Sequence, residues 1–421
     1  MKFDGLMVGF LAVATVLPLG CGDNDDTSDS PLSGAHFGLI RSDSESTSIA
    51  VLDAEGEIVS PSVLSSGSQP PGLVAPLSGD VVLSNSRRGA EGVLNIVDRF
   101  GTDVYTRYDL EGSQVIGQLR VAPGDFSTNP QDVALVDENR GWVSRFSVNL
   151  DPAADAENQA NDVIEIDPSN FTETGRRVSL ESFTDIGTAQ TDEGPMEVDV
   201  FARPSLLALV GDTLVVGLTL LSAAFDAALP GQVALIDVGT AQVSGFALPA
   251  ASRNCGNLRA VPDREDLVMV ACSGFAQPFG DEPQVRASSG VYVLRITRGQ
   301  AELVESWEPA DDMSRPLALQ NVVPLGATQF LAVEFGTFGV SGDEAFVVDM
   351  ETGEATSLFA ATAAFSIGLS AYDSATGVLL VPDSASGALR RYREDTNGFS
   401  LETSLTFSDG PLPPRSMYLL P

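Results

Sequence analysis

The side chains that could carry chemistry in this chain of 421 residues are few, and most of them are carboxylates. His36 is the only histidine, so a Ser-His-Asp or Cys-His arrangement would depend on that one residue. A single histidine also excludes a metal site built from several imidazoles. The remaining option is a hard cation such as calcium, held by carboxylate and amide oxygens. The candidate ligands are Asp132, Asn257 and Asn321. We assign no catalytic residue from the sequence.

Two of the three cysteines have the spacing of a disulfide pair. Cys255 and Cys272 flank a predicted hairpin, and a turn centred between Asp263 and Arg264 places them opposite each other. Cross-strand neighbours have Cα separations that a disulfide can bridge. We therefore predict a disulfide, with two free thiols as the alternative.

The elements that position these residues form a weak repeat of four β-type runs per unit. We number the four runs by their order within each unit. The second run of each unit is a nearly continuous apolar segment, as expected for a strand covered on both faces, and the third run often ends in Asp. The pattern predicts an all-β propeller over 35–421 with seven four-stranded blades; six or eight blades are the alternatives. The predicted first runs are 71–75, 130–136, 204–210, 257–261, 320–325, 367–372 and 415–420.

The two ends of the repeat are incomplete in complementary ways. The last run, 413–420, has no strand after it, and the run 36–40 has no leading strand before it. A ring closes if the C-terminal strand pairs with the N-terminal blade. The sequence therefore predicts a closed ring.

The turns after two third runs resemble a known family. The segments 233–241, Val-Ala-Leu-Ile-Asp-Val-Gly-Thr-Ala, and 346–353, Phe-Val-Val-Asp-Met-Glu-Thr-Gly, look like the third-strand turn of YVTN-type, WD40-like seven-bladed bacterial propellers. Neither a Tyr-Val-Thr-Asn run nor a Trp-Asp signature is present. The resemblance therefore implies the architecture and no functional residue.

The N-terminus indicates export. Residues 6–19 are apolar and have the length of a signal peptide, and 17–21, Leu-Pro-Leu-Gly-Cys, resemble the lipobox of bacterial lipoproteins. The resemblance implies lipidation of Cys21; an ordinary secretory signal is the alternative. We expect a signal peptide at 1–20, a flexible acidic tether at 21–34, and a location in the cell envelope with membrane contact through the lipid anchor only.

The chain is strongly acidic, with a net charge of −35 and Lys2 as its only lysine. Such a surface repels phosphate backbones and excludes nucleic-acid binding. One interpretation of the acidity is solubility in a particular habitat. The other is an acidic face for basic partners.

Long connections after the second runs gather on one face, at 145–161, 219–231, 273–289 and 335–343. Insertions on one face of a repeat array are typical of a binding surface. We therefore expect a monomeric, non-enzymatic scaffold for a basic protein or peptide, without a cofactor. The alternatives are phenylalanines that only pack their own loops, and a calcium-dependent, lactonase-like hydrolase with ligands in the central channel. The residues of the expected face are Phe146, Phe225, Phe275, Phe279, Phe335, Phe338, Asp151, Asp192, Glu193 and Asp281.

Overall fold

The computed structural model describes residues 32, 34–86, 88–155, 157–277, 282–309, 321–407, 410 and 412–421. The predicted signal peptide, Cys21, nearly all of the tether, Phe279 and Asp281 lie outside these residues. None of the helices in the described part is both long and apolar enough to span a membrane. There are two short ones, η1 (Glu181–Phe183) and α1 (Glu282–Ser288).

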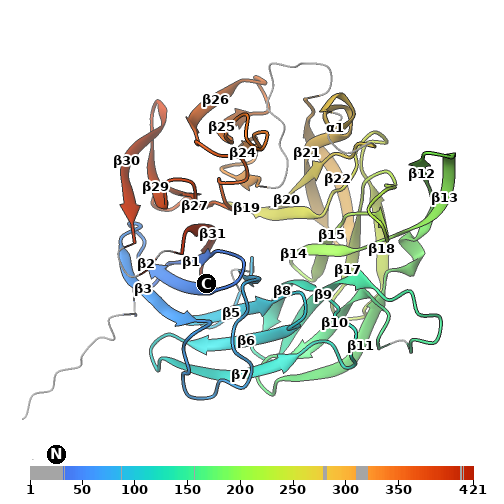
Figure 1. Ribbon diagram of the computed structural model, residues 1–421, viewed down its shortest axis with the longest axis horizontal. Coiled ribbons are helices and arrows are strands. Elements are labelled where there is room, and N and C mark those ends of the chain that lie inside the picture. Colours follow the sequence, from blue (N-terminus) through green and yellow to red (C-terminus); the bar gives the residue numbers. More distant parts are fainter. Residues whose placement is uncertain are drawn as a thin grey trace, which may run out of the picture. The chain divides into compact units, whose positions relative to one another are not determined.

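The described strands form seven antiparallel four-stranded sheets and one three-stranded sheet. Within the unit 31–421 the four-stranded sheets surround a common centre (Figure 1). In order along the chain, the first two of these sheets contain β4 (Val81–Leu83), β5 (Val93–Asp98), β6 (Val104–Asp109) and β7 (Gln114–Arg120), and then β8 (Pro130–Asp137), β9 (Arg140–Val148), β10 (Ala160–Asp167) and β11 (Thr172–Ser179). The next two contain β14 (Pro204–Val210), β15 (Thr213–Leu218), β17 (Gln232–Asp237) and β18 (Val243–Ala247), and then β19 (Asn257–Val261), β20 (Arg264–Ser273), β21 (Ser289–Thr297) and β22 (Gln300–Trp307). Two more contain β23 (Val323–Pro324), β24 (Gln329–Glu334), β25 (Glu344–Asp349) and β26 (Ala355–Ala360), and then β27 (Ala371–Asp373), β28 (Val378–Asp383), β29 (Ala388–Asp395) and β30 (Gly398–Thr406).

The seventh four-stranded sheet closes the ring with both ends of the chain. Its order is β3 (Ile58–Ser65), β2 (Thr47–Leu52), β1 (Phe37–Ser42) and β31 (Pro414–Leu419). The last strand pairs antiparallel with the first, with Phe37 opposite Leu419 and Leu39 opposite Met417. The predicted closure is confirmed.

The hydrophobic core is divided among the contacts between neighbouring sheets. Seven buried clusters occur in the described residues, and each combines side chains of two successive four-stranded sheets. One cluster joins Trp142 to Leu214, and another joins Phe37 of the closing sheet to Leu380. Because both faces of each middle strand are covered, β2, β15 and β28 are buried along their whole length.

One strand assignment from the sequence is wrong. Residues 71–75, expected to be a first strand, form no strand, and β4 is the innermost strand of that sheet. Pro70 and Pro71 have no backbone N–H for a β-ladder, and Gly72 follows with a φ of +83°. These three residues therefore form a turn.

The Asp residues that end third strands cap the turns after them. Asp237 accepts the backbone N–H of Thr240 at 2.7 Å and its hydroxyl at 3.0 Å. Asp349 likewise accepts hydrogen bonds from the backbone N–H of Thr352 at 2.9 Å and from its hydroxyl at 3.2 Å. These hydrogen bonds lower the pKa of both carboxyl groups. For Asp349 the largest cause is a further hydrogen bond, from the side chain of Gln329.

The three-stranded sheet is an addition to the ring. It contains β12 (Asp185–Thr191), β13 (Gly194–Phe201) and the two-residue β16 (Leu221–Ser222). The β12–β13 hairpin lies at the periphery in Figure 1. Its turn carries Asp192 and Glu193, and both are exposed.

Candidate functional site

The inner strands of the sheets enclose a central channel with two cavities. The turn-side cavity, of about 1170 Å³, is lined by turns between first and second strands, such as the turn at Asp263. The loop-side cavity, of about 710 Å³, is lined by residues that follow second strands, such as Phe275. Asn85, Arg259 and Tyr418 line both cavities. We call these three residues the waist of the channel.

A hydrogen-bonded chain of three side chains crosses the waist. Arg259, on β19, donates from Nη1 to the side-chain oxygen of Asn85 at 2.5 Å. The Nδ2 of Asn85 donates in turn to the Asp132 carboxylate at 3.2 Å. The Nε and Nη2 atoms of Arg259 are buried and have no hydrogen-bond partner among the described residues. Burial lowers the pKa of Arg259, with a smaller opposing effect of the nearby Tyr418 and Asp132.

Asp132 is fully buried and serves as an acceptor for backbone groups. Besides Asn85 it accepts the N–H of Val133 at 2.8 Å and of Leu207 at 3.0 Å. Burial is the main cause that raises the pKa of Asp132 to about 6, and these hydrogen bonds limit the rise. Asp132 thus fixes Asn85 and the neighbouring strand β14 in place.

The three predicted cation ligands do not gather around one point. Asn257 and Asn321 line the loop-side cavity, whereas Asp132 lines neither cavity and has its oxygens occupied. Asn321 donates its Nδ2 to the carbonyl of Ile367 at 2.9 Å. Among the residues that the structure describes, no three His, Cys, Asp or Glu side chains come together as possible metal ligands. This donor set does not fit a calcium site, which needs several oxygens around one centre.

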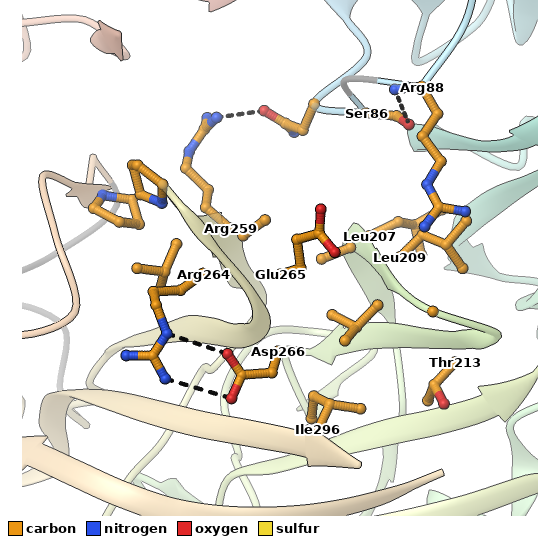
Figure 2. Close-up of a pocket in the computed structure, with 18 of the residues that line it drawn as sticks. Ser86, Arg88, Leu207, Leu209, Thr213, Arg259, Arg264, Glu265, Asp266 and Ile296 are labelled. Carbon is orange, nitrogen blue, oxygen red and sulfur yellow. Dashed lines mark hydrogen bonds and ion pairs between the residues drawn. The ribbon is translucent and has the colours of Figure 1, made fainter. Parts of the chain in front are cut away.

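Charged side chains of both signs line the turn-side cavity beside apolar ones (Figure 2). Arg264 and Asp266 pair with each other at 3.3 and 3.4 Å. Glu265 lies between them in sequence and points into the cavity in Figure 2. In the described part of the chain, the carboxylate of Glu265 has neither a hydrogen bond nor an ion pair. It is therefore available to a bound molecule.

Phenylalanines line the loop-side cavity, and each ends or follows the second strand of its sheet: Phe146, Phe225, Phe275 and Phe335. Four other predicted members of the binding face lie elsewhere, and Phe279 and Asp281 are outside the described residues. Phe338 is 87% exposed and lines neither cavity. Asp151, Asp192 and Glu193 are exposed and also lie outside both cavities. Among the described residues, the structure thus brings four of the predicted phenylalanines together without Asp151, Asp192 or Glu193 at the rim.

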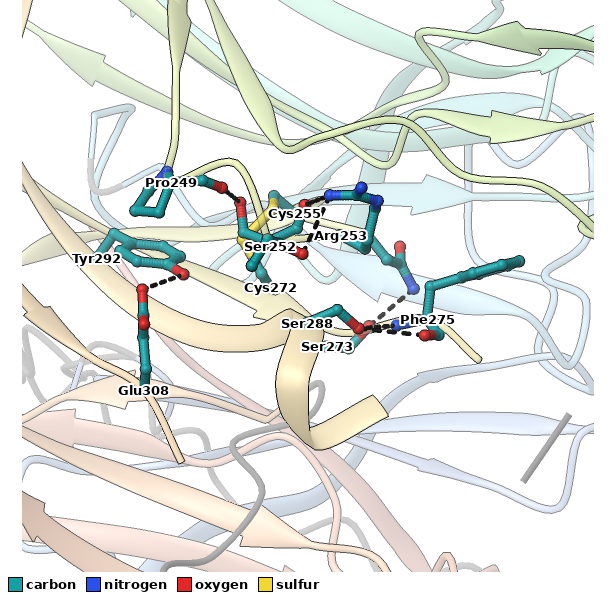
Figure 3. Close-up of a disulfide and its surroundings, with 12 residues drawn as sticks. Pro249, Ser252, Arg253, Cys255, Cys272, Ser273, Phe275, Ser288, Tyr292 and Glu308 are labelled. Atoms are coloured by element: carbon teal, nitrogen blue, oxygen red, sulfur yellow. Dashed lines mark hydrogen bonds between the residues drawn. A yellow bond between two sulfur atoms is a disulfide. The ribbon is translucent and has the colours of Figure 1, made fainter. Parts of the chain in front are cut away.

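The predicted disulfide is present and supports this cavity. Cys255 and Cys272 are bonded, with their Cα atoms 3.9 Å apart (Figure 3). Next to the bridge, Asn254 donates its Nδ2 to the hydroxyl of Ser273 at 2.7 Å. Phe275 donates its backbone N–H to the hydroxyl of Ser288 at 2.9 Å. The loop that carries Phe275 is therefore attached at both of its ends.

Sequence reasoning missed the residues of the waist. Asn257 and Arg259 are two positions apart on β19, so both side chains point to the same face of the strand. Because Asn257 was already a candidate for the channel, this alternation could have identified Arg259 as a second residue facing the channel. Asn85 follows β4, the strand whose place in its sheet was assigned wrongly.

No protein-family model matches the sequence, and no curated protein matches it. Solved structures do match. A proposed 6-phosphogluconolactonase from Bacteroides fragilis covers 94% of this chain and 100% of its own, with 11% identity and a TM-score of 0.55. A protein from Lactobacillus plantarum covers 92% and 99%, with 13% identity and a TM-score of 0.52. The Cps50 (Swd1) β-propeller domain from Myceliophteria thermophila covers 85% and 96%, with 11% identity and a TM-score of 0.51. The chain is a β-propeller.

This likeness also corrects the main functional expectation from the sequence. We expected a non-enzymatic scaffold, yet a protein of the same fold that matches this propeller over its whole length is described as a lactonase. Loop length and acidity do not distinguish a scaffold from an enzyme, because a loop-rich face suits a small substrate as well as a protein partner. The scaffold is therefore not proposed, and the hydrolase, given above as the alternative, is the function that we propose below.

Proposed function

We propose that this propeller hydrolyses lactones, which are cyclic esters, in its central channel. The likeness to a proposed 6-phosphogluconolactonase supports the class of reaction. One observation on this chain carries the proposal. Arg259 stands where the two cavities meet, and its Nε and Nη2 groups lack partners among the described residues. Buried N–H groups without partners cost free energy, and a ligand oxygen would relieve that cost.

During the reaction a negative charge forms on the carbonyl oxygen of the lactone, and Arg259 can stabilise this charge. The oxygen of a water molecule bonds to the carbonyl carbon, the bond from that carbon to the ring oxygen breaks, and the ring oxygen takes up a proton. The product is a hydroxy acid. In the transition state the carbonyl oxygen becomes negatively charged, and fixed N–H donors of a guanidinium stabilise it. Asn85 positions this guanidinium through the 2.5 Å hydrogen bond.

Glu265 is the residue that can move the proton. Its carboxylate projects into the turn-side cavity, which Arg259 also lines. A carboxylate in this place can accept a proton from the attacking water and return it to the ring oxygen. Glu265 is thus the general base and then the general acid of the proposal.

The test is the hydrolysis of D-glucono-δ-lactone and γ-butyrolactone by the purified protein, followed as acid release at constant pH. We expect Arg259→Gln to lower kcat about 100-fold or more, because one donor to the developing oxyanion is worth that much. We expect Glu265→Gln to lower kcat about 100-fold, the usual contribution of a general base. Arg393→Gln and Glu402→Gln are matched controls, because these residues pair with each other outside both cavities. Rates of the unchanged protein equal to those of buffer with both lactones would refute the proposal.

A further inference from the structure

The aromatic walls of the loop-side cavity are fixed before any ligand arrives. The rings of Phe146 and Phe225 stack with centroids 6.4 Å apart and an interplanar angle of 14°. The Arg203 guanidinium carbon lies 5.1 Å from the first ring centroid and 4.4 Å from the second. Arg203 itself donates to the carbonyls of Leu221 and Ser222, both at 3.1 Å. This cation holds both rings in place from the side of the protein.

Phe225 is held in a backbone conformation that favours glycine. Its φ is +61°, and 40% of its surface is exposed. The turn is locked by the Ser222 hydroxyl, which accepts the N–H groups of Asp226 at 2.9 Å and of Ala227 at 3.0 Å. A bulky residue with positive φ costs free energy and is kept where the surrounding structure enforces it. An exposed aromatic ring on a strained turn beside a cavity indicates a role in binding.

The opposite wall is built in the same way around Asp343. This buried carboxylate accepts the N–H groups of Gly336 at 2.9 Å, Phe365 at 2.8 Å and Ser366 at 2.7 Å. It thereby joins the loops of Phe335 and Phe365, whose ring centroids are 5.2 Å apart. Phe365 also has a positive φ, of 57°. Phe365 does not line the cavity itself, but its ring lies against Phe335, which does.

The chemistry of the lining selects an amphipathic ligand. Phenylalanine rings offer no hydrogen bonds, so a polyhydroxylated lactone placed among them would lose its bonds to water without replacement. An alkyl or aryl group gains free energy there by leaving water. Polar groups also line the cavity: among the described residues, the Nε and Nη2 groups of Arg259 and the Asn257 amide have no partner. A volume of about 710 Å³ suits one small molecule.

We propose that the loop-side cavity binds the apolar substituent of a lactone, with the ester group at Arg259 and the alkyl or aryl part between Phe146, Phe225, Phe275 and Phe335. This inference names the substrate class of the lactone hydrolysis proposed above and rests on it. The preferred substrates are lactones with a long apolar side chain, and sugar lactones are poor substrates.

The experiment compares two lactones with the same five-membered ring, γ-butyrolactone and γ-dodecalactone, using the full-length protein. We expect kcat/KM to be higher for γ-dodecalactone by on the order of 100-fold, because each buried methylene adds to transition-state binding. Phe225→Gly removes the ring and also relieves the strain of the positive φ, so the fold is expected to persist. It should lower kcat/KM for γ-dodecalactone about tenfold and that for γ-butyrolactone by much less, because only the first substrate has an alkyl chain to contact the ring.

Two further variants keep the test specific. Phe275→Ala removes a second wall and should have the same selective effect. Phe338→Ala is the matched control, because this residue follows the same strand as Phe335 but is exposed outside the cavity. It should change neither rate.

A binding measurement separates this inference from the proposed hydrolysis. We expect decanoate, titrated calorimetrically, to bind the unchanged protein, to bind Phe225→Gly more weakly, and to lose binding in Arg259→Gln. Equal kcat/KM for the two lactones together with no decanoate binding would overturn the inference and leave the hydrolysis standing. Decanoate binding without hydrolysis of either lactone would overturn the hydrolysis and support the amphipathic ligand.

Discussion

Arg259 and Asn85 are 174 residues apart in the sequence, yet they are joined by a hydrogen bond of 2.5 Å from Nη1 to the side-chain oxygen. Asn85 cannot turn its amide around, because its Nδ2 donates to the Asp132 carboxylate at 3.2 Å. The orientation of Arg259 is therefore set by a carboxylate that it does not touch. The free N–H groups of Arg259 are held in a fixed direction at the waist of the channel.

Asn85 should act on catalysis by positioning Arg259. In Asn85→Ala the guanidinium loses its fixed partner, and we expect kcat for lactone hydrolysis to fall about 10- to 100-fold, the usual effect of a small misplacement. The midpoint of thermal unfolding should change little by comparison. Asn170→Ala, at an exposed turn, is the control and should leave kcat unchanged. An unaltered kcat in Asn85→Ala would show that Arg259 needs no orientation by Asn85.

Asp132 should make stability depend on pH between about 4 and 6. Burial raises its pKa from 3.8 to about 6, so the folded state holds a proton that the unfolded state has lost in this window. The stabilising contribution is complete below pH 3.8 and is lost as the pH rises through 6. We expect the free energy of unfolding, relative to Asp132→Asn, to fall by about 3 kcal/mol across the window. Urea unfolding of the unchanged protein and of Asp132→Asn at several pH values measures this difference in the free energy of unfolding. Parallel pH profiles of the two proteins would contradict the prediction.

The disulfide between Cys255 and Cys272 should stabilise the fold by restricting the unfolded chain. The bridge closes a segment with a sequence separation of 17, for which loop closure predicts about 3 kcal/mol. Replacing both cysteines by serine should lower the urea midpoint accordingly. Reduction of the unchanged protein should produce the same shift, and no shift in either experiment would exclude a stabilising role.

Cys21 should carry a lipid, as the lipobox-like segment before it predicts. We expect the full-length protein to incorporate a labelled fatty acid and to sediment with membranes. Cys21→Ser should do neither, because a signal sequence alone provides no stable anchor. Equal distribution of both proteins between membrane and soluble fractions would support the ordinary secretory signal instead.

The sequence determined those parts of the structure that depend on neighbours along the chain. Hairpins between successive runs, the apolar middle strands and the Cys255–Cys272 pair follow from local alternation and spacing. The pairing of the last strand with the first was also predictable, because the run 36–40 lacked a leading strand and the last run lacked a partner; the register of Phe37 opposite Leu419 came from the structure. The place of β4 was missed because 71–75 begins with proline like the first runs 130–136 and 204–210, whereas the structure has no strand at 71–75.

Only the tertiary structure decided what meets at the axis. Asn85 follows β4, whereas Arg259 and Tyr418 lie on β19 and β31 of two other sheets, so their meeting at the waist depends on the radius and closure of the whole ring. Likewise, four phenylalanines converge on one cavity while Asp192 and Glu193 of the same predicted face project from the peripheral hairpin. The physical reason is that a period of two along a strand specifies which face a side chain takes. It contains no information about the partner that a distant strand brings to that face.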